Sequence, residues 1–409
     1  MKNKLLLFVF LFCNLYNPIS IYFTLLINLL ILLFLTKAYK LNFCLNSNIT
    51  ICTSVVFFLS IFIMVLNFNL NMYVLGKYSR VLISSFLIGL ICGNISVSLK
   101  QIIKSLSFVF LLHIVAVGVQ IVYPDISLPM AIFFGFGRDG DVINDMIFRK
   151  LGLSTSYDTA GLIAILAMVL YFFRYYYEGK IVWLLVSLVS LISCIFISRT
   201  GMLVGALLLF ILLLYLFFTQ HGSKRLVAII GLTSGICIVC YMVLPILAAT
   251  TSFFDYTANV DVSFGNDYTT GTTSGLLGGS HLNAIRSVSP LELILGYGID
   301  PNDVQGMASD IGYVKIIYHV GIVGLLCILW LYFYLFINTF YMNKMFRQKN
   351  INIEILSRFF MLYIMVMMVF NYKSLEIYSR GTHDLLLILF YFMCSFSWKN
   401  VVDNMKLNC

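Results

Sequence analysis

The chain has 409 residues, of which 61% are hydrophobic and 11% are charged, whereas a soluble domain carries about 25% charged residues. This composition excludes a soluble globular fold and predicts an all-α polytopic membrane protein, with residues 1–409 forming one integral membrane domain. The formal net charge of +9 follows from the topology predicted below, and we expect no nucleic-acid partner.

The first predicted element is a helical hairpin. The apolar stretch 5–36 is too long for one span and is interrupted by Asn17-Pro18, so we expect two helices with the proline in their turn. A cleaved signal peptide is the competing interpretation of residues 1–16, because Lys2 and Lys4 precede an apolar run, but no small-residue cleavage site follows.

Further apolar runs approach or reach the roughly 20 residues that cross a hydrocarbon core as a helix. In chain order they are 49–68, 81–99, 102–122, 159–173, 181–197, 202–218, 226–247, 312–337, 355–370 and 385–398. Together with the hairpin they predict about twelve transmembrane helices, which places both termini on one side of the membrane.

The charges predict which side that is. The loops on the side of the termini hold 16 of the 26 basic residues, whereas the opposite side and its helix ends hold 14 of the 17 carboxylates. By the positive-inside rule the termini are cytoplasmic. The two long loops, 123–158 and 248–312, are then periplasmic, and we expect short helices in the larger one. Long loops are usually functional or disordered, so the predicted site faces the periplasm.

Four arginines stand at or near the outer ends of different predicted helices. They are Arg149, Arg199, Arg286 and Arg380. A guanidinium group presents a planar fork of donors that matches phosphate oxygens two at a time, so converging arginines can hold a pyrophosphate without a metal. The alternative is that each one reaches lipid headgroups or pairs with an outer carboxylate. Arg199 favours function most, because its short turn leaves the charge near the bilayer boundary.

A titratable cluster follows the larger loop. Lys315 and His319 share a helix face at i, i+4 spacing, and Asp310 lies just before them. A neutral imidazole or a carboxylate there could take a proton from a hydroxyl. His113, near the middle of its predicted span, is interpreted as a hydrogen-bonded packing residue.

Four short patches, in this order and placed outward, resemble the bacterial O-antigen polymerase (Wzy) family, within the wider group that includes O-antigen ligases. They are Arg149-x-x-Gly152 followed by Asp158 and Ala160-Gly161; Ile197 to Gly201; Leu295 to Gly298; and Ser309 to Val314, which includes Tyr313, continuing through Gly321 to Gly324. Ligases of this group have a histidine where this chain has Asp310, eleven residues before Gly321, and the difference favours a polymerase.

The resemblance implies a glycosyltransferase of the bacterial inner membrane that works without a metal or other cofactor. Its substrates would be undecaprenyl-pyrophosphate-linked oligosaccharides within the lipid bilayer, and a chain-length regulator protein would be a possible partner. Arg149, Arg199, Arg286 and Arg380 would stabilise the departing pyrophosphate, with Lys315 as a fifth group. Asp310 or His319 would orient or deprotonate the acceptor. The secondary candidates are His281, Asp158 and Tyr313.

Two alternatives remain at this stage. An O-antigen ligase would pass a finished glycan to the lipid A core. A flippase or secondary transporter would also suit twelve spans, but such proteins tend to show internal repeats and polar groups at the midplane.

Overall fold

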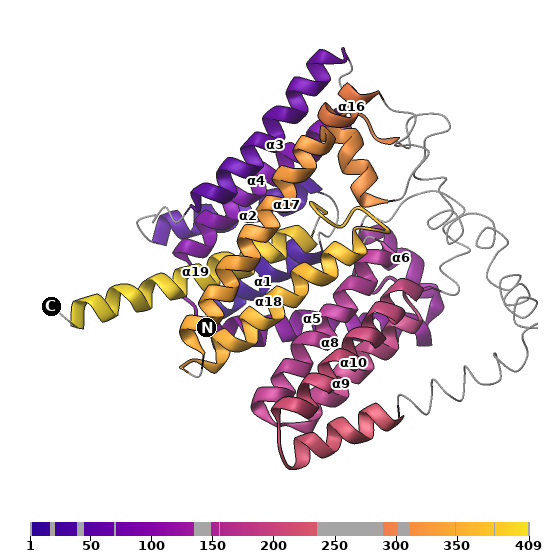
Figure 1. Cartoon of the computed structure of the whole chain (residues 1–409), viewed down its shortest axis with the longest axis vertical. Helices are drawn as coiled ribbons and strands as arrows, with labels where there is room; N and C mark the ends of the chain where they lie inside the picture. Colours follow the sequence, from indigo (N-terminus) through magenta and orange to yellow (C-terminus); the bar gives the residue numbers. More distant parts are fainter. Residues whose placement is uncertain are drawn as a thin grey trace, which may run out of the picture.

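The computed structural model describes residues 2–16, 21–38, 45–68, 71–134, 149–154, 156–234, 289–301, 311–347, 349–379 and 381–407. The regular structure within these ranges is helical (Figure 1). The helices are α1 Lys2–Tyr16, α2 Ile21–Ala38, α3 Ser47–Leu66, α4 Met72–Asn94, α5 Leu99–Val122, η1 Pro124–Ile126, α6 Ser127–Phe133, α8 Tyr157–Glu178, α9 Ile181–Ile195, α10 Arg199–Thr219, α16 Pro290–Leu295, α17 Gly312–Phe346, α18 Ile351–Phe370 and α19 Thr382–Leu407. Residues 223–234 are helical as well.

Seven of the described helices are long and apolar enough to cross a membrane. They are α3, α4, α5, α8, α10, α17 and α18, and the apolar stretches of α1, α2, α9 and α19 are shorter. An all-helical membrane protein is therefore confirmed, while the count of twelve spans and the sidedness stay predictions. The expected hairpin comprises two separate helices, α1 and α2, and its Asn17-Pro18 turn lies outside the described residues, as does the second half of the 226–247 span.

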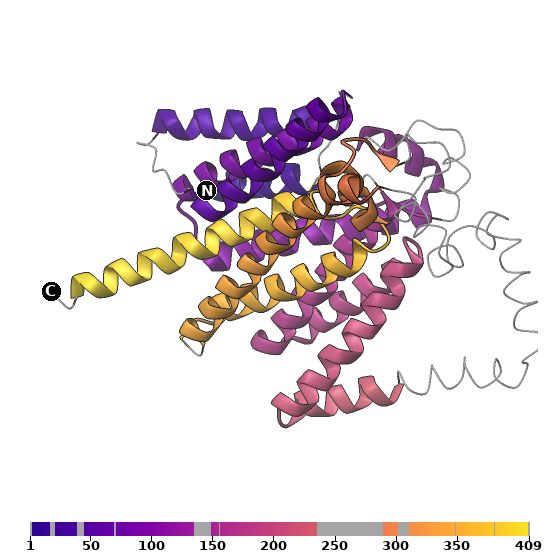
Figure 2. The same cartoon turned by 45° about the horizontal axis from the view of Figure 1, so that its top comes forward.

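The helices pack as two groups that meet along the middle of the molecule. On one side α8 packs against α9, α10, α5 and α18; on the other α4 packs against α3, α2 and α19, and α17 contacts both α3 and α18. Figures 1 and 2 show α8, α9 and α10 lying side by side, away from α3 and α4. The most hydrophobic 18-residue window of α8 is entirely buried, so α8 is the central helix of its group.

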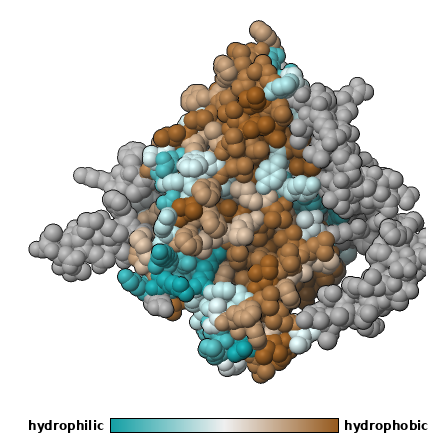
Figure 3. Space-filling view, in the orientation of Figure 1, coloured by the Kyte–Doolittle hydropathy of each residue, from teal (hydrophilic) through white to brown (hydrophobic). Residues whose placement is uncertain are grey.

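The surface matches a membrane environment. Large apolar side chains such as Phe58, Leu203 and Trp330 are 60% or more exposed. Figure 3 shows hydrophobic residues over most of the visible face, with hydrophilic side chains gathered near the connection between α17 and α18. That connection belongs to the predicted cytoplasmic, lysine- and arginine-rich side.

Short polar side chains fix where several helices begin. Asn71 caps α4, Ser156 caps α8 and Ser198 caps α10, each accepting hydrogen bonds from backbone N–H groups of the first turn. These groups have no partner within the helix itself, so a cap stabilises the end by about 1 kcal/mol. The caps therefore set the positions of the helix ends from which the site is built.

The predicted span 312–337 differs from the observed helix in two ways. The helix extends to Phe346, and it is broken at Gly321, where φ is 66° and ψ is −176°. Only glycine tolerates this conformation readily. The break accommodates the turn after α16: a Cβ on Gly321 would lie 2.1 Å from the Ile294 carbonyl oxygen. The backbone N–H groups of Tyr297 and Gly298 donate to the Tyr318 carbonyl oxygen at 2.7 and 3.0 Å.

Candidate functional site

One end of the bundle collects several helix ends and the loop 371–381, which joins α18 to α19. The Asn371 side chain organises this loop, because its Oδ1 accepts hydrogen bonds from the backbone N–H groups of Glu376 and Ile377 at 3.1 and 3.0 Å. The first residue of α17, Gly312, packs so closely on the loop that a Cβ there would lie 2.6 Å from the Asn371 Oδ1 atom. The part of the loop around Asn371 is thereby held against the start of α17 and forms a wall between helices.

A cavity of about 540 Å³ lies against this wall. It is lined by Leu25, Met72, Tyr73, Gly76, Lys77, Ser79, Arg80, Ile83, Ser156, Thr159, Lys315, Ser374, Leu375, Glu376, Tyr378 and Ser379. The first turns of α4, α8 and α17 all contribute to this lining, so the N-terminal ends of three helices border the cavity. Another hollow of about 540 Å³ lies on the outward face of α3, but its lining residues, from Thr50 to Phe62, carry no charge.

The lining of the first cavity, which we call the cationic cavity, carries more basic than acidic side chains. Lys77, Arg80 and Lys315 are basic and Glu376 is the one acidic residue in the lining, while Arg80 is paired with Asp384 outside it. Lys77 lies within electrostatic range of Arg80 and Lys315. Cations and helix N-termini together favour an anion such as a phosphate or a pyrophosphate.

Arg80 is held by a buried ion pair. Its Nη1 atom lies 2.9 Å from the Asp384 Oδ2 atom, with the two side chains 5% and 0% exposed. Its Nη2 atom donates to the Tyr378 carbonyl oxygen at 2.8 Å. Tyr378 itself has a φ of 63°, a conformation that costs a residue other than glycine of order 1–3 kcal/mol. The protein thus maintains strain and buried charge where it positions the Arg80 guanidinium.

Glu376 lies in the wall of the cationic cavity and is only 2% exposed. The Thr159 hydroxyl donates to its two carboxylate oxygens at 3.1 and 3.3 Å, and the Ser374 hydroxyl donates at 3.1 Å. Burial, followed by the nearby Asp158 carboxylate, raises the pKa of Glu376 to about 7. The group can therefore exchange a proton near neutral pH.

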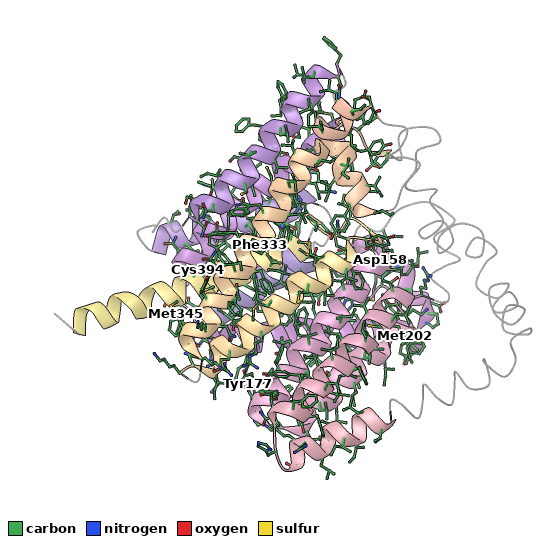
Figure 4. All side chains as sticks on the ribbon, in the orientation of Figure 1. Asp158, Tyr177, Met202, Phe333, Met345 and Cys394 are labelled. Atoms are coloured by element: carbon green, nitrogen blue, oxygen red, sulfur yellow. The ribbon has the colours of Figure 1, made fainter. Side chains whose placement is uncertain are left out.

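Asp158, a secondary candidate from the sequence, lies just outside the cationic cavity. Its Oδ1 atom is 2.9 Å from Lys373 Nζ, and the two side chains are 21% and 31% exposed. Figure 4 shows Asp158 at the end of α8 beside the loop 371–381, with Tyr177 at the opposite end of the same helix. From the first turn of α8, the Asp158 carboxylate therefore contributes to the raised pKa of Glu376.

Of the predicted pair Lys315 and His319, only Lys315 lies at the cavity. Lys315 lines the cationic cavity, whereas His319 is fully buried and is absent from the lining. The role of Lys315 in holding a pyrophosphate stays a prediction. His319 Nδ1 lies 3.3 Å from the Tyr78 hydroxyl and its Nε2 lies 3.5 Å from Asp300 Oδ2. Its predicted contact with an acceptor hydroxyl stays untested, and its observed contacts are those of a packing residue.

Two predicted arginines start neighbouring segments. The Lys150 N–H donates to the Phe196 carbonyl oxygen at 2.7 Å. This hydrogen bond joins the segment after Arg149 to the turn before Arg199. The helices that follow meet at glycines, because a Cβ on Gly201 would lie 3.2 Å from the Gly161 Cα atom.

Within that arrangement the Arg149 guanidinium lies 5.3 Å from the centre of the Tyr157 ring, while the Arg199 side chain lies outside the described residues. Arg286, Arg380, Asp310 and His281 also lie outside them, so the gathering of the four arginines stays a prediction.

Two further residues considered from the sequence, His113 as a packing residue and Tyr313 as a secondary site candidate, make contacts between elements. His113 is fully buried, and its Nδ1 accepts a hydrogen bond from the Leu153 N–H at 3.2 Å, which confirms it as a packing histidine. The Tyr313 hydroxyl donates to the Met368 carbonyl oxygen at 2.8 Å, so Tyr313 joins α17 to α18. Within the described ranges, no group of three His, Cys, Asp or Glu side chains could hold a metal ion.

No family model matches the chain, and no curated protein matches it either. The function is therefore inferred from the geometry of the cationic cavity. The sequence interpretation missed Lys77, Arg80 and Glu376 as site residues. The available signal was the pair of basic residues at i, i+3 spacing where the apolar run of α4 begins, because a charge at that depth needs a partner or a function.

Proposed function

We propose that this protein is a surface-polysaccharide (O-antigen) polymerase of the bacterial inner membrane. It would join undecaprenyl-pyrophosphate-linked repeat units at the periplasmic face, using the cationic cavity for the pyrophosphate of the donor. The observation that carries the proposal is the placement of Lys77, Arg80 and Lys315 around one cavity that the N-terminal turns of three helices border. Such preorganised charge stabilises the negative charge that develops on a departing pyrophosphate.

The apolar part of the cavity lining supports a lipid-linked substrate. Met72, Tyr73 and Ile83 line the cavity and are 67%, 62% and 47% exposed. In a membrane these side chains face lipid, so a prenyl chain can leave the cavity beside α4 while its pyrophosphate stays among the cations. The four sequence patches that resemble the polymerase family also contact one another in two pairs, as far as they are described. The segment after Arg149 contacts the turn before Arg199, and the turn at Gly296 contacts Gly321.

The test is a lipopolysaccharide gel from a deletion strain complemented with variants. Loss of a polymerase leaves core plus one repeat, whereas bare core would identify a ligase and refute the choice of polymerase. We expect Lys77→Gln and Lys315→Gln each to shorten or abolish the long chains. Lys344→Gln, an exposed lysine at the other end of α17, is the matched control and should give normal chains.

Binding of undecaprenyl pyrophosphate to the purified protein tests the cavity directly. A hydrogen bond to a charged group contributes about 1.5–3 kcal/mol, so losing one cation should weaken binding by about tenfold to a hundredfold. Unchanged binding in both the Lys77 and Lys315 variants would exclude this cavity as the pyrophosphate site.

A secondary transporter is the second candidate, because α17 is broken at Gly321 and discontinuous helices form the binding sites of many transporters. Flux of the lipid-linked repeat across vesicles without any glycan joining would favour this candidate over the polymerase.

A further inference from the structure

Glu376 is the one acidic residue among those that line the cationic cavity. The hydroxyl groups of Ser156, Thr159 and Ser374 surround it in the same lining. They form a hydrogen-bonded sequence, in which Ser156 donates to the Thr159 hydroxyl at 2.8 Å and Thr159 donates to the Glu376 carboxylate. The Glu376 carboxylate is therefore held by hydroxyl groups in the wall of the cationic cavity.

The other nearby carboxylates are engaged elsewhere. Asp384 forms the ion pair with Arg80, Asp158 forms the ion pair with Lys373, and Asp300 lies beside His319. None of these three belongs to the cavity lining. Glu376 is thus the best-placed proton acceptor in the described part of the cavity.

We propose that Glu376 is the general base of the glycosyl transfer, an assignment that depends on the polymerase function proposed above. The oxygen of the acceptor hydroxyl forms a bond to the anomeric carbon of the donor as that carbon's bond to the pyrophosphate oxygen breaks. The pyrophosphate leaves with the bonding electron pair, and the hydroxyl proton moves to the Glu376 carboxylate. The proton then passes to bulk water before the next cycle, so atoms and charge balance.

The charged groups around Glu376 set its working pH. Lys77 faces it from α4, Lys315 lines the same cavity from α17, and Asp158 lies in the first turn of α8. Tyr363 of α18 is in electrostatic range, and Lys373 on the same loop is held by Asp158. The Glu376 pKa of about 7 lies close to the operating pH of the cell, where a general base is most effective.

The decisive variants are Glu376→Gln and Glu376→Asp, with Glu178→Gln at the opposite end of α8 as the matched control. Glu376→Gln keeps the side-chain size and hydrogen-bond acceptance but removes the base, so long chains should fall by about 10²–10⁴-fold, while binding of undecaprenyl pyrophosphate stays within about twofold. Glu376→Asp should restore part of the activity, and Glu178→Gln should behave as the parent protein. Normal chains in Glu376→Gln would overturn the assignment and leave the polymerase proposal standing.

A pH profile keeps the assignment testable even where Glu376→Gln fails to fold. In membrane vesicles of the parent protein, a base with a pKa of about 7 must be deprotonated, so the rate should fall about tenfold for each pH unit below 7. A rate that does not change between about pH 5 and pH 8 would overturn the assignment. Failure of the Lys77 and Lys315 variants to change binding or chain length would instead overturn the polymerase proposal.

Discussion

The buried ion pair between Arg80 and Asp384 predicts a specific pattern of stability. Asp384→Leu leaves the Arg80 guanidinium buried without its partner, and Arg80→Met does the same to the carboxylate. Removing one member of a buried pair typically costs about 3–5 kcal/mol. The double variant loses both charges, and its remaining cost is the unmet Tyr378 carbonyl oxygen, which accepts from Arg80 at 2.8 Å and is worth about 1–3 kcal/mol. We therefore expect the double variant to be more stable than either single variant.

Unfolding of the purified protein in mixed detergent micelles, titrated with SDS and followed by tryptophan fluorescence, measures these free energies. The control is Lys373→Met, because its pair with Asp158 is 31% and 21% exposed and should contribute about 0–1 kcal/mol. Two results would contradict this role of the ion pair. One is that Asp384→Leu lowers the free energy of unfolding no more than Lys373→Met does. The other is that the double variant is no more stable than the less stable of the two single variants.

The same double variant separates folding from function. It removes one of the basic groups of the cationic cavity without leaving a buried charge uncompensated, so the protein should reach the membrane yet make few long chains. Normal chain length in that variant would remove Arg80 from the pyrophosphate site.

Three further variants test individual packing contacts. Gly321→Ala should lower the free energy of unfolding by about 3 kcal/mol or more, because its φ and ψ alone penalise alanine by of order 1–3 kcal/mol and the added Cβ would lie 2.1 Å from a carbonyl oxygen. Gly118→Ala, on a helix with open space around it, should be neutral or stabilising by up to about 1 kcal/mol. Gln120→Leu should cost about 1–3 kcal/mol for each backbone group it leaves unmet, because its side chain bonds both the N–H and the carbonyl oxygen of Gly152 at 2.9 and 3.1 Å. Equal unfolding curves for the two glycine variants, or no loss in Gln120→Leu, would contradict these contacts.

The fold was largely predictable because its signals are local. Long apolar runs identify spans one at a time, and Asn17-Pro18 separates α1 from α2 without reference to the rest of the chain. The break at Gly321 could not be predicted in this way. Residues 312–337 have the composition of one continuous helix, and the non-helical conformation at Gly321 matches the close approach of the turn after α16, which is a tertiary contact.

The site was predictable only in part, for a similar reason. The charge of Lys315 at the end of the large loop was visible in the sequence, and the structure places it in the cationic cavity. Lys77 and Glu376 belong to segments nearly 300 residues apart, and nothing local shows that they line the same space. The sequence hypothesis of a pyrophosphate site named four arginines at or near predicted helix ends, whereas two of the three basic side chains in this cavity are lysines.

The distribution of buried charge supports the proposal that the cavity is a functional site. A buried ion pair such as that of Arg80 with Asp384 commonly stabilises a protein no more than apolar residues of the same volume would. The positive φ of Tyr378 costs further free energy, and so does the burial of Glu376 beside Asp158. These three costs meet around one cavity, where they fix a guanidinium and a carboxylate in place. A chain that needed only to pack its helices would have no reason to concentrate them there.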